Sequence, residues 1–245
     1  MNSLTGTRPP PSGDGLSSLP PEWLARLAHD MRGPIMPIRM AAQILEAPGL
    51  RTEQLPEIGR TIERQVGRLQ QIANDLDDIL RIGLGIFEMH LAPHDLDHMV
   101  EAALLATTSL AASIGRNSRP LALRPSAQHI LVDADEEQLV RLLAQMFIAV
   151  APGNYPGAES WIGCEAVDGL AVVRLHDDAA RIYRSAGIEY LTTGKIPEDP
   201  GVLSMAPVIG RKVAIGHRAT ISASEDKDGR IAELVLRMPL SATHH

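Results

Sequence analysis

Two stripes of apolar residues at helical spacing, separated by a short turn, dominate the first third of the chain. The second stripe runs from Ile58 to Ile79 with an apolar residue every three or four positions, close to the seam of a coiled coil. The first runs from Leu24 to Leu45 and ends before Ala47-Pro48-Gly49, again at helical spacing. Together they predict a helical hairpin. One hairpin cannot bury both stripes, so we expect a second copy of the chain to complete a four-helix bundle.

Charged and proline residues refine this hairpin. The positions between the apolar residues of the second helix hold Arg60, Glu63, Arg64, Arg68, Asp75, Asp77 and Asp78, which we expect to form a solvated outer face. Pro21 suits the start of the first helix, where a missing N–H costs nothing. Pro34 and Pro37 lie inside the first stripe and predict a kink.

Beyond Gly85 the pattern changes to short helices mixed with hairpin-connected strands. Strands are predicted at 129–132, 161–167, 170–175, 219–224 and 231–238, helices at 136–150 and 208–215, and a long loop at 183–206. Such a mixture is typical of an α+β sandwich. The expected organisation is a disordered tail over 1–20, the hairpin over 21–84, the α/β sandwich over 85–240 and a short tail over 241–245.

The composition is that of an ordinary soluble globular protein. Of the 245 residues 44% are hydrophobic but only 3% aromatic, so the core must be built from Leu, Ile, Val, Met and Ala. A net charge of −7 argues against a nucleic-acid partner. No apolar run is long enough for a membrane helix, and no signal-peptide pattern opens the chain. The single Cys164 cannot form an internal disulfide, which favours a reducing compartment. Together these features predict a cytoplasmic protein without a membrane partner.

The segment with the most specific pattern is Leu24-Ala25-Arg26-Leu27-Ala28-His29-Asp30-Met31-Arg32-Gly33-Pro34-Ile35. It resembles the phosphoacceptor box of the sensor histidine kinases of two-component signalling, H-[ED]-[LM]-R-x-P-[LI]. The resemblance implies that His29 accepts a phosphoryl group and that Asp30 orients the ring and accepts its proton. A neutral imidazole is a good nucleophile near pH 7, which suits this role. Without the resemblance, His29 would be an ordinary exposed histidine.

The box also contains a departure from the family. Many members carry Asn or Thr four residues after the histidine, where it orients water for dephosphorylating the partner regulator. Here that residue is Gly33, which has no side chain, so we expect phosphatase activity of this kind to be absent. The kink expected at Pro34, one turn beyond His29, would open space for a docking partner.

Further segments resemble the family in the same order over nearly all of residues 22–240. They are 74–82 (second dimerisation helix), 132–135 (start of the ATP-binding domain), 188–193 (a worn F box) and 217–221 (H-G-G-x-I with both glycines lost). The resemblance implies a dimeric helical hairpin followed by an α/β sandwich of the histidine-kinase ATP-binding type.

The positions that bind nucleotide in the family are changed in this chain. The family's two asparagines fall on Gln145 and Ala149, and its adenine-binding aspartate falls on Asp177. The glycines after that aspartate fall on Ala179 and Arg181, and the second glycine box falls on 204–207. Ala149 has no oxygen for Mg²⁺, and the lost glycines crowd the path of the phosphates. Asp177 is either a residual adenine contact or a solvated turn residue. ATP and Mg²⁺ are therefore expected only if this atypical site works.

Three functions fit these observations. The first is a homodimer that carries phosphate on His29 and exchanges it with the aspartate of a response-regulator receiver domain, with autokinase activity weak or lost. Histidine phosphotransferases of kinase-like architecture resemble the chain in this respect. The second is an active sensor histidine kinase that autophosphorylates His29 from ATP. The third is a non-catalytic dimer that binds a regulator.

Three histidines and the single cysteine are further candidates for chemical sites. His90, His94 and His98 lie four residues apart, a spacing that can indicate a metal site on a helix. Pro93 disfavours one continuous helix through them, so solvated linker histidines are favoured and no metal is predicted. Cys164, on a predicted strand, is expected to be a buried small apolar residue rather than a nucleophile.

Overall fold

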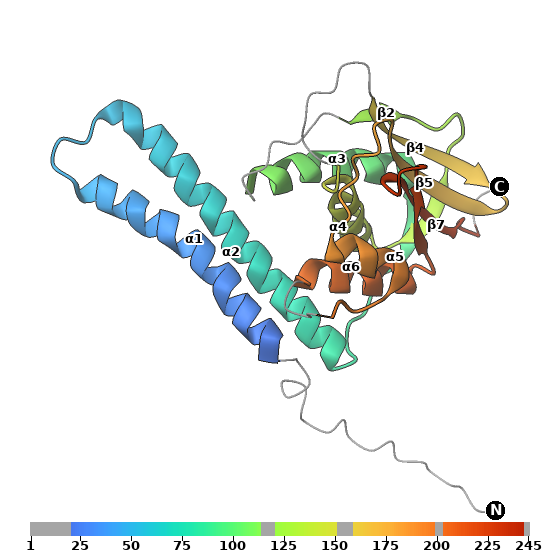
Figure 1. Ribbon diagram of the computed structural model, residues 1–245, viewed down its shortest axis with the longest axis horizontal. Helices are drawn as coiled ribbons and strands as arrows, with labels where there is room; N and C mark the ends of the chain where they lie inside the picture. Colours follow the sequence, from blue (N-terminus) through green and yellow to red (C-terminus); the bar gives the residue numbers. More distant parts are fainter. Residues whose placement is uncertain (1–20, 114–120, 151–158, 199–202, 243–245) are drawn as a thin grey trace, which may run out of the picture.

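The computed structural model describes residues 21–113, 121–150, 159–198 and 203–242, and it begins with a helical hairpin (Figure 1). Helices α1 (Pro21–Glu46) and α2 (Leu55–Gly83) lie side by side, joined by a turn and the 3₁₀-helix η1 (Thr52–Gln54). Gly49 in the turn has a φ of 91°, a conformation that favours glycine. The predicted hairpin is confirmed, and both prolines of the first stripe lie within α1.

The remainder is an α/β domain in which four helices cover one face of a sheet (Figure 1). The sheet order is β2 (Ala122–Arg124), β4 (Ser160–Val167), β5 (Leu170–Asp177), β7 (Ile231–Pro239) and β6 (Thr220–Glu225), and only the β2–β4 pair is parallel. A two-stranded ladder pairs β1 (Ala92–Asp95) with β3 (Leu131–Ala134). The helices are α3 (Leu96–Ser113), α4 (Glu136–Phe147), α5 (Ala186–Thr193) and α6 (Met205–Gly216). This is the α+β architecture expected from the sequence.

One apolar core joins these helices to the sheet. Leu139, Leu143 and Phe147 of α4 belong to the same buried cluster as Ile162 of β4 and Leu175 of β5. The cluster consists almost entirely of Leu, Ile, Val, Met and Ala, as the low aromatic content predicted. Burial of such side chains contributes about 1.5–3 kcal/mol each, so this domain has its own stable core.

The predicted long loop at 183–206 is wrong in its first half, where the structure has helix α5, and at its last two residues, where α6 begins. The Ser185 side chain accepts a hydrogen bond from the Ile188 N–H at 3.2 Å and caps the helix start. Gly194, with a φ of 74°, caps its end. Ile188 and Leu191 are buried, so the glycines that suggested a loop instead mark the limits of a short helix.

Helix α3 and strands β1 and β2 were not predicted, and β3 begins two residues later than the predicted strand. The start of α3 does carry a sequence signal, because Asp95 Oδ1 accepts from the His98 N–H at 3.1 Å in the manner of an N-cap. The helix is apolar on most of its faces and therefore lacks a clear amphipathic period.

The two tails predicted at the ends of the chain have different outcomes in the structure. The expected tail over 1–20 lies outside the described residues. Ser241, in the expected C-terminal tail, is buried, and its hydroxyl donates to Asp133 Oδ1 at 2.7 Å. Among the described residues, no helix is both long and apolar enough to cross a membrane.

Candidate functional site

The predicted phosphoacceptor His29 lies on α1 with its ring in solvent. Its side chain is 80% exposed, and its Nδ1 lies 3.2 Å from Oδ1 of Asp30. A carboxylate can only accept a hydrogen bond, so this contact favours the tautomer with the proton on Nδ1. The other nitrogen, Nε2, then keeps its lone pair and is the nucleophilic atom.

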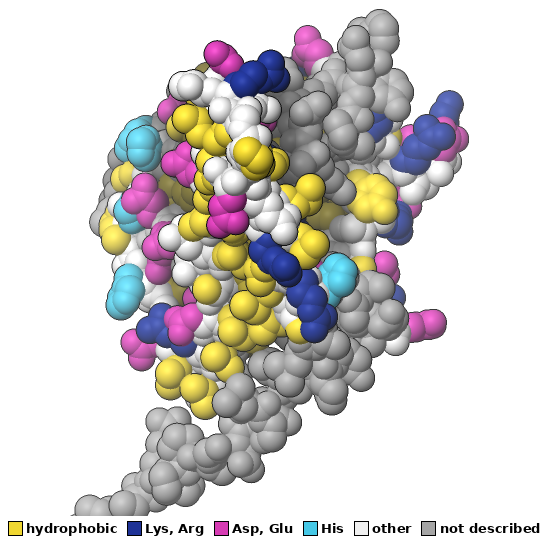
Figure 2. All heavy atoms as spheres, turned by 90° about the vertical axis from the view of Figure 1, so that its left-hand side faces the viewer, with side chains coloured by type: hydrophobic (Ala, Val, Ile, Leu, Met, Phe, Trp, Pro, Cys, Tyr) yellow, Lys and Arg dark blue, Asp and Glu magenta, His cyan; other side chains and the backbone are white. Residues whose placement is uncertain are grey.

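The hairpin around His29 exposes an apolar surface. Figure 2 shows hydrophobic side chains gathered in a band along the hairpin. The exposed large apolar residues of the two helices are Met31, Ile35, Met36, Met40, Ile44, Leu45, Leu55 and Val66. An exposed apolar surface of this extent marks an interaction site. Next to it, Gly33 has nothing within 4 Å of the place where a Cβ would be.

The α/β domain holds a chamber lined by residues aligned with the nucleotide-binding boxes. Its volume is about 570 Å³, and its walls include Gln145 and Ala149 at the end of α4 and Ala206 and Pro207 at the start of α6. The sequence alignment therefore brought together residues that are neighbours in space. The Ala149 side chain offers no oxygen to this chamber, and its carbonyl accepts a hydrogen bond from the Tyr183 N–H at 2.8 Å.

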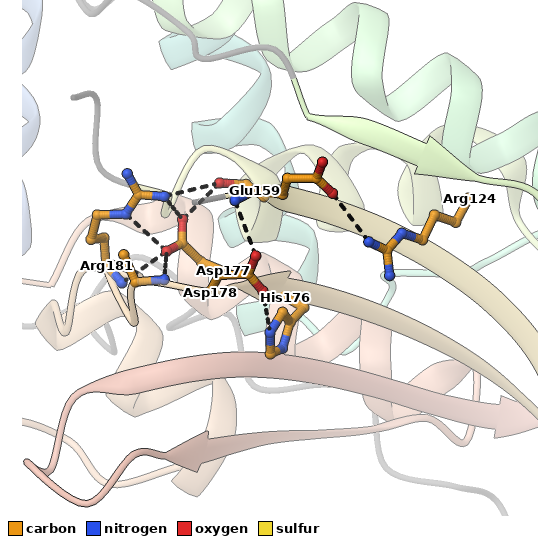
Figure 3. A network of polar contacts seen from close by, with 8 residues as sticks. Arg124, Glu159, His176, Asp177, Asp178 and Arg181 are labelled. Carbon is orange, nitrogen blue, oxygen red and sulfur yellow. Dashed lines mark hydrogen bonds and ion pairs between the residues drawn. The ribbon is translucent and has the colours of Figure 1, made fainter. Parts of the chain in front are cut away.

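Asp177, the proposed adenine contact, is completely buried at the end of β5 and bonded to the chain itself (Figure 3). Its Oδ1 accepts from Arg181 Nε at 2.8 Å and from the Ala179 N–H at 2.9 Å. Its Oδ2 accepts from Arg181 Nη2 at 2.6 Å and from Ser160 Oγ at 2.7 Å. The solvated-turn alternative is therefore wrong.

The electrostatics of Asp177 follow from these contacts. Burial by itself would raise the pKa of this carboxyl, but the hydrogen bonds from Arg181, Ser160 and the Ala179 N–H hold the pKa below its usual range. Arg181 is the residue that the resemblance matched to a glycine of the family. Its guanidinium occupies both carboxylate oxygens, and Asp177 is not among the described residues that line the chamber.

Asp178, the next residue, is partly exposed and has different partners (Figure 3). One carboxylate oxygen accepts from the Glu159 N–H at 3.1 Å, and the other lies 3.2 Å from His176 Nε2. Glu159 in turn pairs with Arg124 at 3.3 Å. This surface network is separate from the buried pair of Asp177 and Arg181.

An ion-pair cluster joins the hairpin to the α/β domain, and sequence reasoning missed it. Arg141 of α4 donates from Nη2 to Asp75 at 2.9 Å and from Nη1 to Asp78 at 2.7 Å, both on α2. The two aspartate side chains are only 11% and 10% exposed, so their assignment to a solvated outer face is wrong. Burial raises the pKa of Asp75, opposed by hydrogen bonds from Gln71 and Arg141. The sequence signal was the pair of acids at adjacent turns of α2.

His217, which resembles the histidine of the family's H-G-G-x-I segment, is held by hydrogen bonds within the chain. Its Nδ1 lies 2.8 Å from the Val213 carbonyl, and its Nε2 accepts from the Asp135 N–H at 2.9 Å. Burial lowers the pKa of His217, which keeps the ring neutral. Asp135 also caps α4 by accepting from the Gln138 N–H, so His217 connects the end of α6 to the start of α4.

The histidines near Pro93 and the buried Cys164 form neither a metal site nor a nucleophilic site among the described residues. Pro93 lies in strand β1, which confirms that no helix runs through His90 and His94. No group of three potential metal ligands occurs among the described residues. Cys164 is buried on β4 as predicted, and burial raises the pKa of its thiol, so it has little thiolate character at neutral pH.

Comparison with known sequences adds two findings. Residues 22–85 match the family model of the His Kinase A (phospho-acceptor) domain. The sensor histidine kinase MtrB of Mycolicibacterium paratuberculosis is 26% identical over 123 residues, a match that covers 49% of this chain and 21% of MtrB. The matched region therefore spans only about a fifth of that relative.

Solved histidine kinases have the same arrangement of elements. AdeS of Acinetobacter baumannii matches with a TM-score of 0.58 and 14% identity over 87% of this chain and 98% of its own. ThkA in complex with the response regulator TrrA matches with a TM-score of 0.55 and 14% identity over 94% and 64%. Full-length ShkA in complex with AMPPNP matches with a TM-score of 0.51 and 22% identity over 91% and 46%.

These matches agree with the geometry. The phosphoacceptor family model covers the hairpin that carries His29, and the structural matches extend through the α/β domain. Residues 22–85 thus match the His Kinase A phosphoacceptor domain, and the hairpin together with the α/β domain has the fold of solved histidine kinases.

Proposed function

We propose that this protein carries phosphate on His29 and exchanges it with the aspartate of a response-regulator receiver domain, while its own autokinase activity is weak or lost. The observation that carries the proposal is the exposed His29 ring with Asp30 at its Nδ1, within a phosphoacceptor domain. An exposed, oriented imidazole is what an incoming phosphorylated protein requires of its acceptor.

The transfer step follows from the ring geometry. Nε2 of His29 attacks the phosphorus of the receiver's aspartyl phosphate, a P–N bond forms, and the P–O bond to the aspartate breaks as its carboxylate leaves. The ring becomes cationic as the bond forms. The Nδ1 proton then passes to, or is stabilised by, the Asp30 carboxylate 3.2 Å away. The reverse sequence returns the phosphoryl group to a second receiver.

The weak or lost autokinase activity is supported by the α/β domain. Mg²⁺ needs oxygen ligands, and Ala149 supplies none from its side chain at the family's metal-binding position. The Asp177 carboxylate is held on both oxygens by the chain's own groups. The residues present therefore do not fit ATP and Mg²⁺ in the manner of the family, and positioning is most of what catalysis of phosphoryl transfer requires.

Dimerisation and a receiver partner belong to the same proposal. The exposed apolar band of the hairpin (Figure 2) supports pairing with a second copy into a four-helix bundle. The ThkA structure contains a response regulator, which supports a receiver domain as the kind of partner. We propose a cytoplasmic location, without a nucleic-acid or membrane partner.

The relay is tested by adding a labelled, phosphorylated receiver domain and measuring acid-labile phosphate on the protein. We expect label on the wild type and none on His29→Gln, with His129→Gln, at another exposed ring, unchanged. Equal labelling of the wild type and His29→Gln would disprove the proposal.

The active-kinase alternative is tested separately with Mg²⁺ and γ-labelled ATP. We expect no His29-dependent label. Label that disappears in His29→Gln would show that the altered site works and would establish the kinase function instead. Absence of label in both assays, with retained binding to a receiver, would favour the non-catalytic dimer.

A further inference from the structure

A second cavity lies between the hairpin and the α/β domain, next to the nucleotide-type chamber described above. It has a volume of about 640 Å³, within the range typical of small-molecule sites. Its wall on α2 includes Arg60, Arg64 and Arg68, and Arg141 of α4 also lines it. We call it the arginine cleft.

The arginines that line the cleft outnumber its two acidic residues, Glu63 and Asp75. Arg60 pairs with Glu57 at 2.8 Å, and Arg141 is committed to the two aspartates of α2. Arg64 makes one long contact, 3.4 Å to the Thr61 hydroxyl. Arg68 is only partly exposed, and among the described residues its guanidinium forms no hydrogen bond or ion pair. A partly desolvated cation without a counterion is costly, so this wall suits an external anion.

The local charge stands out because the whole chain is acidic, with a net charge of −7. Arg64 and Arg68 are four residues apart on α2, so they lie on one face about 6 Å apart along the helix axis. Two guanidinium groups at that separation can bind neighbouring anionic groups of one flexible ligand. A guanidinium group binds phosphate through two parallel hydrogen bonds, in a bidentate manner.

The cleft also adjoins the apolar chamber. Leu110, Gln145 and Ala206 line both cavities. A ligand whose anionic part lies on the arginines would therefore direct the rest of its structure toward apolar walls. This arrangement suits a linear phosphate chain, either free or attached to a nucleoside.

We propose that the arginine cleft binds a small polyanion, a di- or triphosphate group held by Arg64 and Arg68 without a metal ion. The site is distinct from His29 and does not depend on the phosphate relay. Since its walls come from both the hairpin and the α/β domain, a bound ligand would bridge the two parts of the molecule, in addition to the ion pairs of Arg141.

The test is calorimetric titration of the full chain with tripolyphosphate and with ADP, at low salt and with a chelator to remove divalent metals. We expect saturable binding that weakens as salt screens the charges. In the double variant Arg64→Gln/Arg68→Gln the loss of charge-assisted hydrogen bonds should raise the Kd at least about tenfold. Thermal unfolding of the unliganded variants checks that they remain folded.

The matched control is Arg81→Gln, an exposed arginine of the same helix that is not part of the cleft wall. It should bind like the wild type. Equal weakening by Arg81→Gln would mean attraction to diffuse charge and would overturn the site, as would absence of binding by the wild type at millimolar ligand.

The two ligands separate the two sources of phosphate. Tighter binding of ADP assigns the site to nucleotides whose base enters the adjoining chamber, and tighter binding of tripolyphosphate assigns it to a free phosphate chain. His29→Gln should bind either ligand like the wild type. Failure of the relay with retained binding would thus contradict only the proposed function, and the reverse result would contradict only the arginine cleft.

Discussion

His29 and Asp177 are two residues to which the resemblance to histidine kinases assigns chemistry, and their surroundings in the structure are opposite. The His29 ring is 80% exposed, and its Nδ1 lies next to the carboxylate of the adjacent Asp30. Asp177 is completely buried, and both of its oxygens are bonded to groups of the same chain. The first is accessible to another protein, whereas the second would have to give up an internal ion pair before it could bind anything.

The same contrast extends to the surroundings of the two residues. The hairpin leaves an apolar band in solvent (Figure 2), whereas the α/β domain buries its apolar residues in one core. A surface of the first kind gains free energy when a partner covers it. The apolar residues of the hairpin are thus available to a partner, whereas those of the α/β domain are already packed against one another.

The largest expected effect separates the two residues by function. His29→Gln should reduce phosphate uptake from a phosphorylated receiver to background, because the nucleophilic nitrogen is removed. Asp177→Asn should leave the initial rate of uptake unchanged at a temperature at which the variant is folded. Transfer rates from a quenched time course with acid-labile phosphate as the readout would measure both. A comparable loss in Asp177→Asn would mean that the buried pair takes part in transfer.

The next largest effect is on stability, and it distinguishes the buried Asp177 from its neighbour Asp178. Asp177→Asn removes the charge that compensates the buried Arg181, so we expect unfolding free energy to fall by about 3 kcal/mol. Asp178→Asn, at the neighbouring and partly exposed residue, should cost less than about 1 kcal/mol. Urea titrations of the three proteins would give the values. Similar costs for the two substitutions would show that the buried pair contributes no more than a surface contact.

The hairpin was predictable because its signal is local and periodic: the stripe from Ile58 to Ile79 fixes a helix whatever else the chain does. The pairing of Asp177 with Arg181 was not, because it depends on how a turn folds back at the end of a strand. Arg141 could not be paired with Asp75 from the sequence for a similar reason, since 66 residues separate them. In the α/β domain the hairpin strands were found from their turns, but α5 was hidden by glycines that serve as its limits.

A smaller effect is expected where the two regions meet. Arg141→Gln would leave Asp75 and Asp78 on α2 without their guanidinium partner, and we expect a loss of about 2 kcal/mol, reduced because the cluster is partly exposed. The loss should also loosen the α/β domain from the hairpin, measured as faster hydrogen exchange in α2 and α6. Arg81→Gln on the same helix is the control and should change neither quantity. Unchanged exchange in Arg141→Gln would mean that apolar packing alone holds the two parts together.

The smallest effect is a pH dependence confined to the α/β domain. The pKa of His217 is lowered in the folded protein by burial, so just below pH 6.5 the unfolded chain binds more protons at this residue than the folded one. Its contribution to stability is therefore complete above about pH 6.5 and falls with decreasing pH, by at most about 1.4 kcal/mol per pH unit. Protonation of His217 Nε2 would also remove the acceptor for the Asp135 N–H. The nearby negative charge of the Asp135 carboxylate raises the pKa of His217 and so reduces this loss of stability. The test is urea titration between pH 7.5 and 5.5, about one unit on either side of the free histidine pKa. The wild type should show this slope, and His217→Gln should not. An equal slope in both would mean that the pH dependence does not come from His217.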